Sequence, residues 1–567
     1  MALHRIIQSH LNSFVKSFAL EADSEATQFE KFSTHCVIAN RYSSTFDLDD
    51  VVTGVGDDSI DGVAVVVDES VAVSAGDIQA VFASPRRHHD VDVIFVQAKR
   101  SDGFDLGDFL KFKEGILRFA NQTPYGANDE VLTEARSIFD IVVQEVPKVR
   151  NGRPSLTARF VSTGLYQKPD ALETAIKDFE VQLKALGLFH DVDVRFLDRE
   201  DLTQLWVGTY SAIEASLPVF SHAALPNISG IDEAYLAVVK ASDFVNNLLV
   251  TPDGNLRGQV FEENVRSFLG EDNVVNASIA ATLASDGASR FPVLNNGITL
   301  VCPEVKMQGT TLHLTNYQIV NGCQTSNVLF QNRESLGDIM VNIKVVKTQL
   351  EDVFSDLVRA TNSQSKVDAP QFLSLRPIVR RVEQYFNTFE GEDGRLYLER
   401  RDRQYVGLGI PALRIFPINS AAKCVAAMWC NRPDLSARYP KQLYEELTET
   451  ILTDSVKEQI YYAACLTMYR FNIYVSNSVV PQNMKRFKWH VLALVRAVLC
   501  GASLPKLNPK AAEQQSQTIV NVMQQHSAAA TDVFTKIVEV VARLGDVTRD
   551  RLKRQTILQD MFQFMQQ

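Results

Sequence analysis

Nine residues, Val91–Lys99 (VDVIFVQAK), constrain the fold more than any other stretch of this chain. Apart from Asp92 the run is apolar and rich in β-branched residues up to Val96, which is typical of a central strand covered by helices on both faces. Because side chains alternate along a strand, Gln97 and Lys99 share a face at its carboxyl end. In open α/β sheets the chemistry usually lies at that end.

Asp61 precedes a second apolar run, Val63–Val67, which we expect to pair as a neighbouring strand. This pairing would bring Asp61 close to Gln97 and Lys99. Hydrolysis of a phosphodiester needs a divalent metal that withdraws charge from the phosphate, and a cation near the attacking water. Asp61 and the carbonyl oxygen of Gln97 can supply hard oxygen ligands to Mg²⁺ or Mn²⁺. Lys99 can orient the water and stabilise the developing negative charge.

A third acid lies on the predicted helix 24–39, where Glu30 stands beside an apolar stripe formed by Phe29, Phe32, Cys36 and Val37. Asp61 with Gln97-Ala98-Lys99 resembles the PD-(D/E)XK restriction-endonuclease fold, in which Mrr-like members carry Gln in place of the second acid. Such members also have a Glu on the first helix, so the resemblance implies a catalytic role for Glu30. Two departures are Ile60, which stands where Pro is usual, and a long loop over residues 75–90.

Each of these features also has an ordinary structural interpretation. A Lys often closes an apolar strand, and an Asp-Gly turn before a strand is common in folds without catalytic activity. Gln97 brings no negative charge to a metal. An inactive nuclease fold that serves as a sensor or binding protein therefore stays open as an alternative.

Four strings further along the chain are FPVLNNGITLV, IVNGCQTSNVLF, RATNSQSKVDAPQF and YLERRDRQY. They are similar to the abortive infection phage resistance (AIPR) family, whose members often join this domain to an N-terminal D-x-x-I-D-G and Q-x-K arrangement. The resemblance extends from Phe29 to about Tyr405. It implies bacterial antiphage defence. Because an unrestrained nuclease would damage the host chromosome, we expect the nuclease to be held inactive until a phage-derived trigger arrives.

The second string predicts a strand over 317–320, a tight turn at Asn321-Gly322 and a helix that starts near Thr325. This geometry presents backbone N–H groups to an anion, so Asn321, Gly322, Gln324 and Thr325 are candidates for ligand sensing. VNGCQT is also faintly similar to the DGQQR motif of ParB/sulfiredoxin-like nucleotidases, with Asn321 in place of the acid and Thr325 in place of the Arg. A nucleotide-acting enzyme and an ordinary turn both remain alternatives.

Basic residues gather in three places. Lys111 and Lys113 lie on a predicted helix over 106–119, where they either face phosphates or form a solvated helix face. Arg400 and Arg401 belong to an Arg cluster with interleaved acids, which favours mutual ion pairs over a phosphate clamp. The segment 485–490 (KRFKWH) either contacts nucleic acid by charge and stacking or anchors a helix in a bundle.

Composition limits the remaining classes. The formal charge of −11 argues against a general nucleic-acid coat, which would need a basic surface. The seven Cys, without C-x-x-C spacing, suit a reducing cytoplasm and predict no zinc site. Since no run approaches the about 18 apolar residues of a spanning helix, we expect a cytoplasmic protein with no membrane association.

The length of 567 residues requires several domains. We predict a multidomain α/β protein whose C-terminal apolar stripes suit bundle packing or a homodimer. Its expected function is Mg²⁺-dependent cleavage of nucleic acid, with double-stranded DNA as the expected substrate and the AIPR region as the control. The predicted parts are an N-terminal amphipathic helix (1–22), a PD-(D/E)XK-like nuclease domain (23–145), an α/β connector (146–222), an α/β AIPR core (223–420) and an all-α C-terminal bundle (421–567).

Overall fold

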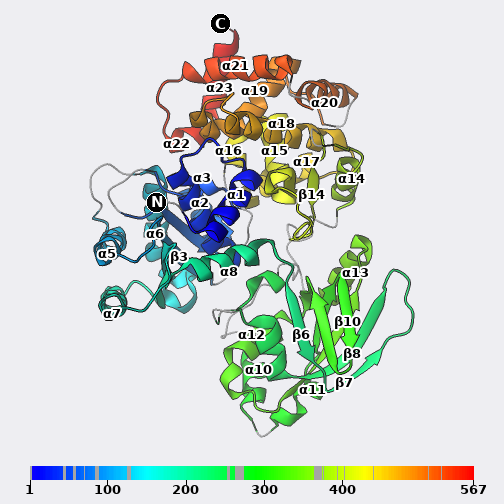
Figure 1. The fold of residues 1–567 in the computed structure, drawn as a ribbon. Coiled ribbons are helices and arrows are strands. Elements are labelled where there is room, and N and C mark those ends of the chain that lie inside the picture. Colours follow the sequence, from blue (N-terminus) through cyan, green and yellow to red (C-terminus); the bar gives the residue numbers. More distant parts are fainter. Residues whose placement is uncertain are drawn as a thin grey trace. The chain divides into compact units, whose positions relative to one another are not determined.

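Two units make up the fold in the computed structural model (Figure 1): Met1–Thr209 with Arg376–Gln567, and Tyr210–Leu375. Both ends of the chain therefore belong to the same unit. The structure describes residues 3–42, 46–54, 59–68, 70–83, 88–123, 129–251, 254, 256–261, 274–285, 287–362, 373, 376–391, 394–400, 403–437, 440–507, 510–524 and 527–566.

A five-stranded sheet with the order β2-β1-β3-β4-β5 forms the centre of the N-terminal half of the first unit. The predicted central strand is confirmed as β3, which pairs antiparallel with β1 and parallel with β4. In register, Gly62 lies opposite Val96 and Val65 opposite Val93. The strands are β1 (Gly62–Val67), β2 (Ser70–Ala72), β3 (Val91–Lys99), β4 (Ser155–Ser162) and β5 (Val192–Leu197).

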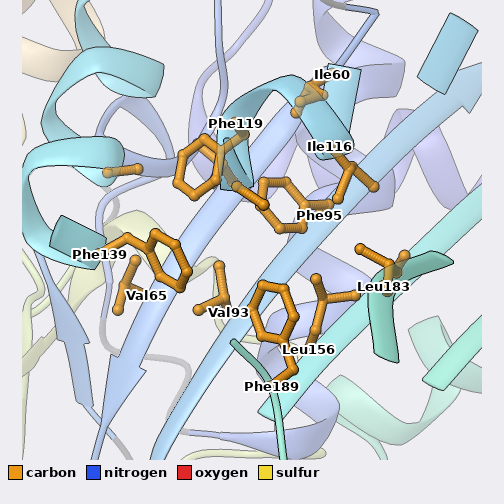
Figure 2. Close-up of a cluster of buried hydrophobic side chains, with 14 of the residues drawn as sticks. Ile60, Val65, Val93, Phe95, Ile116, Phe119, Phe139, Leu156, Leu183 and Phe189 are labelled. Atoms are coloured by element: carbon orange, nitrogen blue, oxygen red, sulfur yellow. The ribbon is translucent and has the colours of Figure 1, made fainter. Parts of the chain in front are cut away.

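Helices cover both faces of this sheet, which explains why β3 is apolar on both sides. Val93 and Phe95 pack with one group of helices, α4 (Ala75–Phe82), α5 (Leu106–Ala120), α6 (Glu130–Gln144) and α7 (Asp170–Ala185). Figure 2 shows this cluster, with Phe119 and Phe139 beside the strands. Ile94 and Val96 pack with the other group, α1 (Arg5–Phe18), α2 (Glu25–Arg41), α3 (Leu48–Val51) and α8 (Arg199–Tyr210).

Three expectations about this half need correction. The segment 75–90, expected to be a long loop, begins with α4. Strands β4 and β5 extend the sheet that contains β1 and β3, so the predicted connector 146–222 does not form a sheet of its own. The apolar run over 141–147 also predicts a strand from sequence, yet this segment contains the end of α6. Its apolar residues continue the helical spacing of Ile138, Phe139 and Val142, which are buried against the sheet.

The C-terminal part of the first unit is helical from Ile418 onward, as predicted. Two buried guanidinium groups cap helix ends there: Arg496 Nε donates to Met428 O (2.9 Å) and Arg470 Nε to Met523 O (2.8 Å). The elements are α14 (Pro377–Phe386), β14 (Tyr397–Glu399), β15 (Ile415–Pro417), α15 (Ile418–Cys430), α16 (Pro433–Ser436), α17 (Pro440–Ile451), α18 (Glu458–Ser476), α19 (Lys488–Cys500), α20 (Lys510–Met523), α21 (Ala528–Ala542), α22 (Arg549–Leu552) and α23 (Thr556–Gln566). Within the described part of the chain, no helix has the length and apolar character that crossing a bilayer requires.

Ion pairs join this helical part to the N-terminal half. The cations come from the helical part and the acids from the N-terminal half: Lys485 with Asp23 (3.4 Å), Lys488 with Asp47, Arg549 with Asp50 (3.6 Å) and Lys553 with Glu134 (3.3 Å). The basic segment 485–490 is therefore occupied by carboxylates of the same chain.

The second unit contains a five-stranded sheet, β12-β9-β13-β8-β7, and a three-stranded sheet, β10-β11-β6. Two hydrophobic clusters form its core, and in the larger one buried Tyr317 donates a hydrogen bond to Leu248 O (2.7 Å). The strands are β6 (Glu214–Pro218), β7 (Ser221–Ala224), β8 (Glu233–Lys240), β9 (Ile298–Cys302), β10 (Glu304–Gln308), β11 (Thr311–Thr315), β12 (Gln318–Asn321) and β13 (Met340–Lys347). The α-helices are α9 (Ala241–Phe244), α10 (Val274–Leu283), α11 (Phe291–Leu294), α12 (Cys323–Gln331) and α13 (Glu351–Asn362).

Candidate active site

The loop before β1 fixes the backbone of Asp61. Ser59 has a positive φ of 52°. Asp61 N donates to Val96 O (2.9 Å), and Asp61 O accepts from Thr53 N (3.0 Å). Because Asp61 is bonded on both sides, its side chain is directed by the fold rather than by a flexible turn.

The carboxylate of Asp61 lies at the end of β3, as the sequence predicts. Its Oδ2 accepts hydrogen bonds from Ala98 N (2.7 Å) and from Gln97 Nε2. Gln97 is 1% exposed, and its Oε1 is buried without a hydrogen-bond partner among the described residues. An unpaired buried acceptor is costly, so this oxygen is suited to a ligand that the protein itself does not supply.

A close contact between α2 and β1 brings Glu30 to the same place. A Cβ at Gly62 would lie 2.8 Å from Thr34 Cγ2 and closer still to Thr34 Oγ1, so only Gly allows this approach. Thr34 and Glu30 are four residues apart and share one face of α2. Burial raises the pKa of Glu30 to about 7, with a further rise from Asp61, while Lys99 and Lys31 oppose it.

Asp61 and Lys99 complete the electrostatic group. Burial raises the pKa of Asp61 to about 6, against the effects of the Ala98 N–H and of Lys99. Lys99 is half-buried, and within the described ranges its amine makes no hydrogen bond or ion pair. The structure thus brings together Glu30, Asp61, Gln97 and Lys99, the four residues predicted to be catalytic.

These groups fit a hard divalent cation. The carboxyl groups of Glu30 and Asp61 have raised pKa values, and a cation would stabilise their charged forms. The amide oxygen of Gln97, which has no partner among the described residues, is a further oxygen donor. Over the described residues, no cluster of three or more His, Cys, Asp or Glu could hold a metal.

The candidate nucleic-acid contacts lie on other elements than the four residues predicted to be catalytic. Lys111 is exposed and pairs with Asp108 on its own helix (3.3 Å), while Lys113 is half-buried on the same helix. This arrangement favours the solvated helix face. Arg400 is buried and pairs with Glu383 (2.9 Å), which favours the ion-pair interpretation over a phosphate clamp. Arg401 lies outside the described residues.

The second unit contains the predicted strand, turn and helix. β12 ends at Asn321, Gly322 has φ of 90°, and α12 begins at Cys323, two residues earlier than expected. Asn321 Nδ2 donates to Thr361 O (2.6 Å), and Asn295 Nδ2 donates to Thr325 Oγ1 (3.1 Å). Gln324 is half-buried. Three of the four strings similar to AIPR thus meet at this turn.

The family model described as AIPR protein matches residues 261–544. The chain belongs to the AIPR family. Membership in AIPR suggests a role in antiphage defence by abortive infection. No curated protein and no solved structure matches the chain.

The AIPR match covers parts of both units and continues past residue 420, where we placed the end of the AIPR core. It begins after the sheet that contains Asp61 and Lys99. Sequence reasoning missed the residues that position the site, namely Thr34, Thr53 and Gly62. The spacing of four between Glu30 and Thr34 is the one signal of this contact in the sequence.

Proposed function

We propose that this AIPR protein is a metal-dependent endonuclease that hydrolyses phosphodiester bonds of nucleic acid, with double-stranded DNA as the expected substrate, in antiphage defence. One observation carries the proposal: Asp61 and Lys99 both act on the pKa of Glu30, and Lys99 acts on that of Asp61, beside a Gln97 oxygen that has no hydrogen-bond partner among the described residues. They come from a helix, a loop and a strand, and none of the three forms an ion pair with another described residue.

Each residue has a role that follows from its surroundings. Asp61 and Gln97 would hold Mg²⁺, which when bound supplies charge withdrawal from the scissile phosphate. Lys99 has no internal partner among the described residues, so its amine can orient the attacking water and stabilise negative charge. Glu30, with a pKa of about 7, is suited to accept a proton from that water near neutral pH.

The alternative of an inactive sensor is less well supported. Burying acids that lack an ion-pair partner destabilises a fold, and such groups persist where function requires them. A decayed nuclease would gain stability by replacing Glu30 or Asp61 with an amide. The nucleotide-acting alternative has weaker support still, because Asn321 and Thr325 are bonded to Thr361 and Asn295.

Contacts with the helical part support control of this site. Lys485 pairs with Asp23 just before α2, and Ser476 hydrogen-bonds Glu21. On α2 itself, Lys31 pairs with Asp23 (3.0 Å) and Asp49 (2.6 Å). A movement of the helical part would therefore shift the helix that carries Glu30. We infer that a phage-derived signal acts through this connection.

Plasmid cleavage and metal-dependent melting together test the proposal. Purified protein should nick or linearise plasmid DNA with Mg²⁺ or Mn²⁺, and a chelator should stop the reaction. Mg²⁺ should raise the Tm because a ligand that binds the folded state stabilises it. Asp61→Asn should remove this rise, whereas Asp178→Asn, on an exposed part of α7, should keep it. Absence of both cleavage and a metal-induced Tm shift would contradict the proposal.

A further inference from the structure

Arg100 follows Lys99 directly and reaches the first turn of α2. Its Nη2 donates to Glu25 Oε2 at 2.7 Å. The Glu25 side chain is 78% exposed and that of Arg100 is 26% exposed. An ion pair with one partner so exposed contributes little to stability, and a competing anion can replace that partner.

The guanidinium of Arg100 uses few of its donors. Glu25 is its one acceptor among the described residues, and its Nε is buried without a hydrogen-bond partner. Arginine carries five N–H donors in a planar fork. A phosphate accepts two of them in parallel, which would satisfy donors that a single contact with Glu25 leaves unused.

The position of this pair relates it to the candidate active site. Glu25 and Glu30 lie on the same helix, five residues apart, which corresponds to about 7.5 Å along the axis. Lys99 is the last residue of β3, and Arg100 follows it directly. A nucleic-acid strand whose scissile phosphate lies at Lys99 would bring another phosphate toward Arg100.

We propose that Arg100 binds a backbone phosphate next to the scissile one, and that Glu25 holds the Arg100 guanidinium in an ion pair until substrate arrives. This inference rests on the proposed nuclease function. Glu25 then acts as a substitute for phosphate that weakens non-productive binding of nucleic acid. The competing explanation is an ion pair that only fastens the start of α2 to β3.

The test measures binding of a labelled DNA duplex in chelator, where no cleavage occurs, over a series of salt concentrations. Arg100→Gln should weaken binding and make the slope of log affinity against log salt shallower by about 0.9. Glu25→Gln should tighten binding several-fold, because it releases Arg100. In the Arg100→Gln background, Glu25→Gln should have no effect.

Asp178→Asn, which removes one exposed negative charge from α7, is the matched control and should leave affinity nearly unchanged. Equal effects of Glu25→Gln and Asp178→Asn, or an effect of Glu25→Gln that persists without Arg100, would overturn the inference. So would a lower Tm of Arg100→Gln with unchanged affinity and salt slope. Because binding is measured without metal, failure of these variants is distinct from failure of plasmid cleavage, which tests the nuclease function itself.

Discussion

Thr34 and Gly62 are in contact so close that no side chain larger than hydrogen fits at position 62. This contact sets the distance between α2 and β1 and thereby the position of Glu30 relative to Asp61. In the Asp-Gly pair of the site, Gly62 is therefore required by packing against Thr34 as well as by the turn.

Gly62→Ala should push α2 away from β1. We expect a loss of about 1–3 kcal/mol in the free energy of unfolding, as for other overpacked sites, and a larger fractional loss of cleavage. Chemical denaturation and plasmid cleavage measure the two effects. Thr34→Ala in the same protein should restore part of both, since it removes Oγ1 and Cγ2. No rescue would show that the contact does not position Glu30.

Glu30 gives the stability of the metal-free protein a defined pH dependence. Its folded-state pKa of about 7 lies above the ordinary value of 4.5. A carboxyl with a raised pKa favours folding below its unfolded pKa, and that contribution is lost as the pH rises through the folded pKa. Glu30→Gln should therefore melt at a higher temperature than wild type at pH 8 in chelator.

The difference in Tm should shrink as the pH falls from 7 toward 4.5, where Glu30 becomes protonated in both states. Melting curves at a series of pH values measure it. A Tm difference that is constant over this range would contradict the buried environment of Glu30.

Lys485 pairs with Asp23, two residues before α2, and so links the helical part to the start of that helix. If the helical part restrains the nuclease, Lys485→Ala should raise plasmid cleavage in the absence of any trigger and reduce the growth of uninfected cells. Lys536→Ala, an exposed position on α21, serves as the control. A cleavage rate equal to that of wild type would exclude this contact from regulation.

Much of the first unit could be predicted from sequence because the signals are local. The apolar run of β3, the stripe of α2 and the acid before β1 each occupy one short segment, and together they predicted the four residues of the site. The pairing of β3 with β4 was not visible, since the partner of a parallel strand lies far along the chain. The ion pair between Asp23 and Lys485 was hidden for the same reason.

Variants of Thr325 and Gln324, which follow the turn at Asn321-Gly322, test a structural role and a sensing role separately. Thr325→Ala leaves Asn295 Nδ2 without its acceptor, so we expect a loss of about 1–3 kcal/mol in stability and a lower Tm. Gln324→Ala should abolish protection against phage while the purified protein stays folded. Plaque counts and melting curves on the same variants distinguish the two roles. Full protection by Gln324→Ala would remove this turn from the mechanism.

Cleavage by the Lys99→Ala variant tests the central claim most directly. Lys99 makes no hydrogen bond or ion pair among the described residues, so its removal should lower the Tm only slightly, through the loss of its attraction to Glu30 and Asp61, and should abolish Mg²⁺-dependent cleavage of plasmid DNA. Lys113→Ala, which removes a half-buried lysine from α5, should cleave like wild type. Both variants and wild type should be purified identically to exclude host nucleases. Full cleavage by Lys99→Ala would contradict the assignment of this site as a nuclease centre.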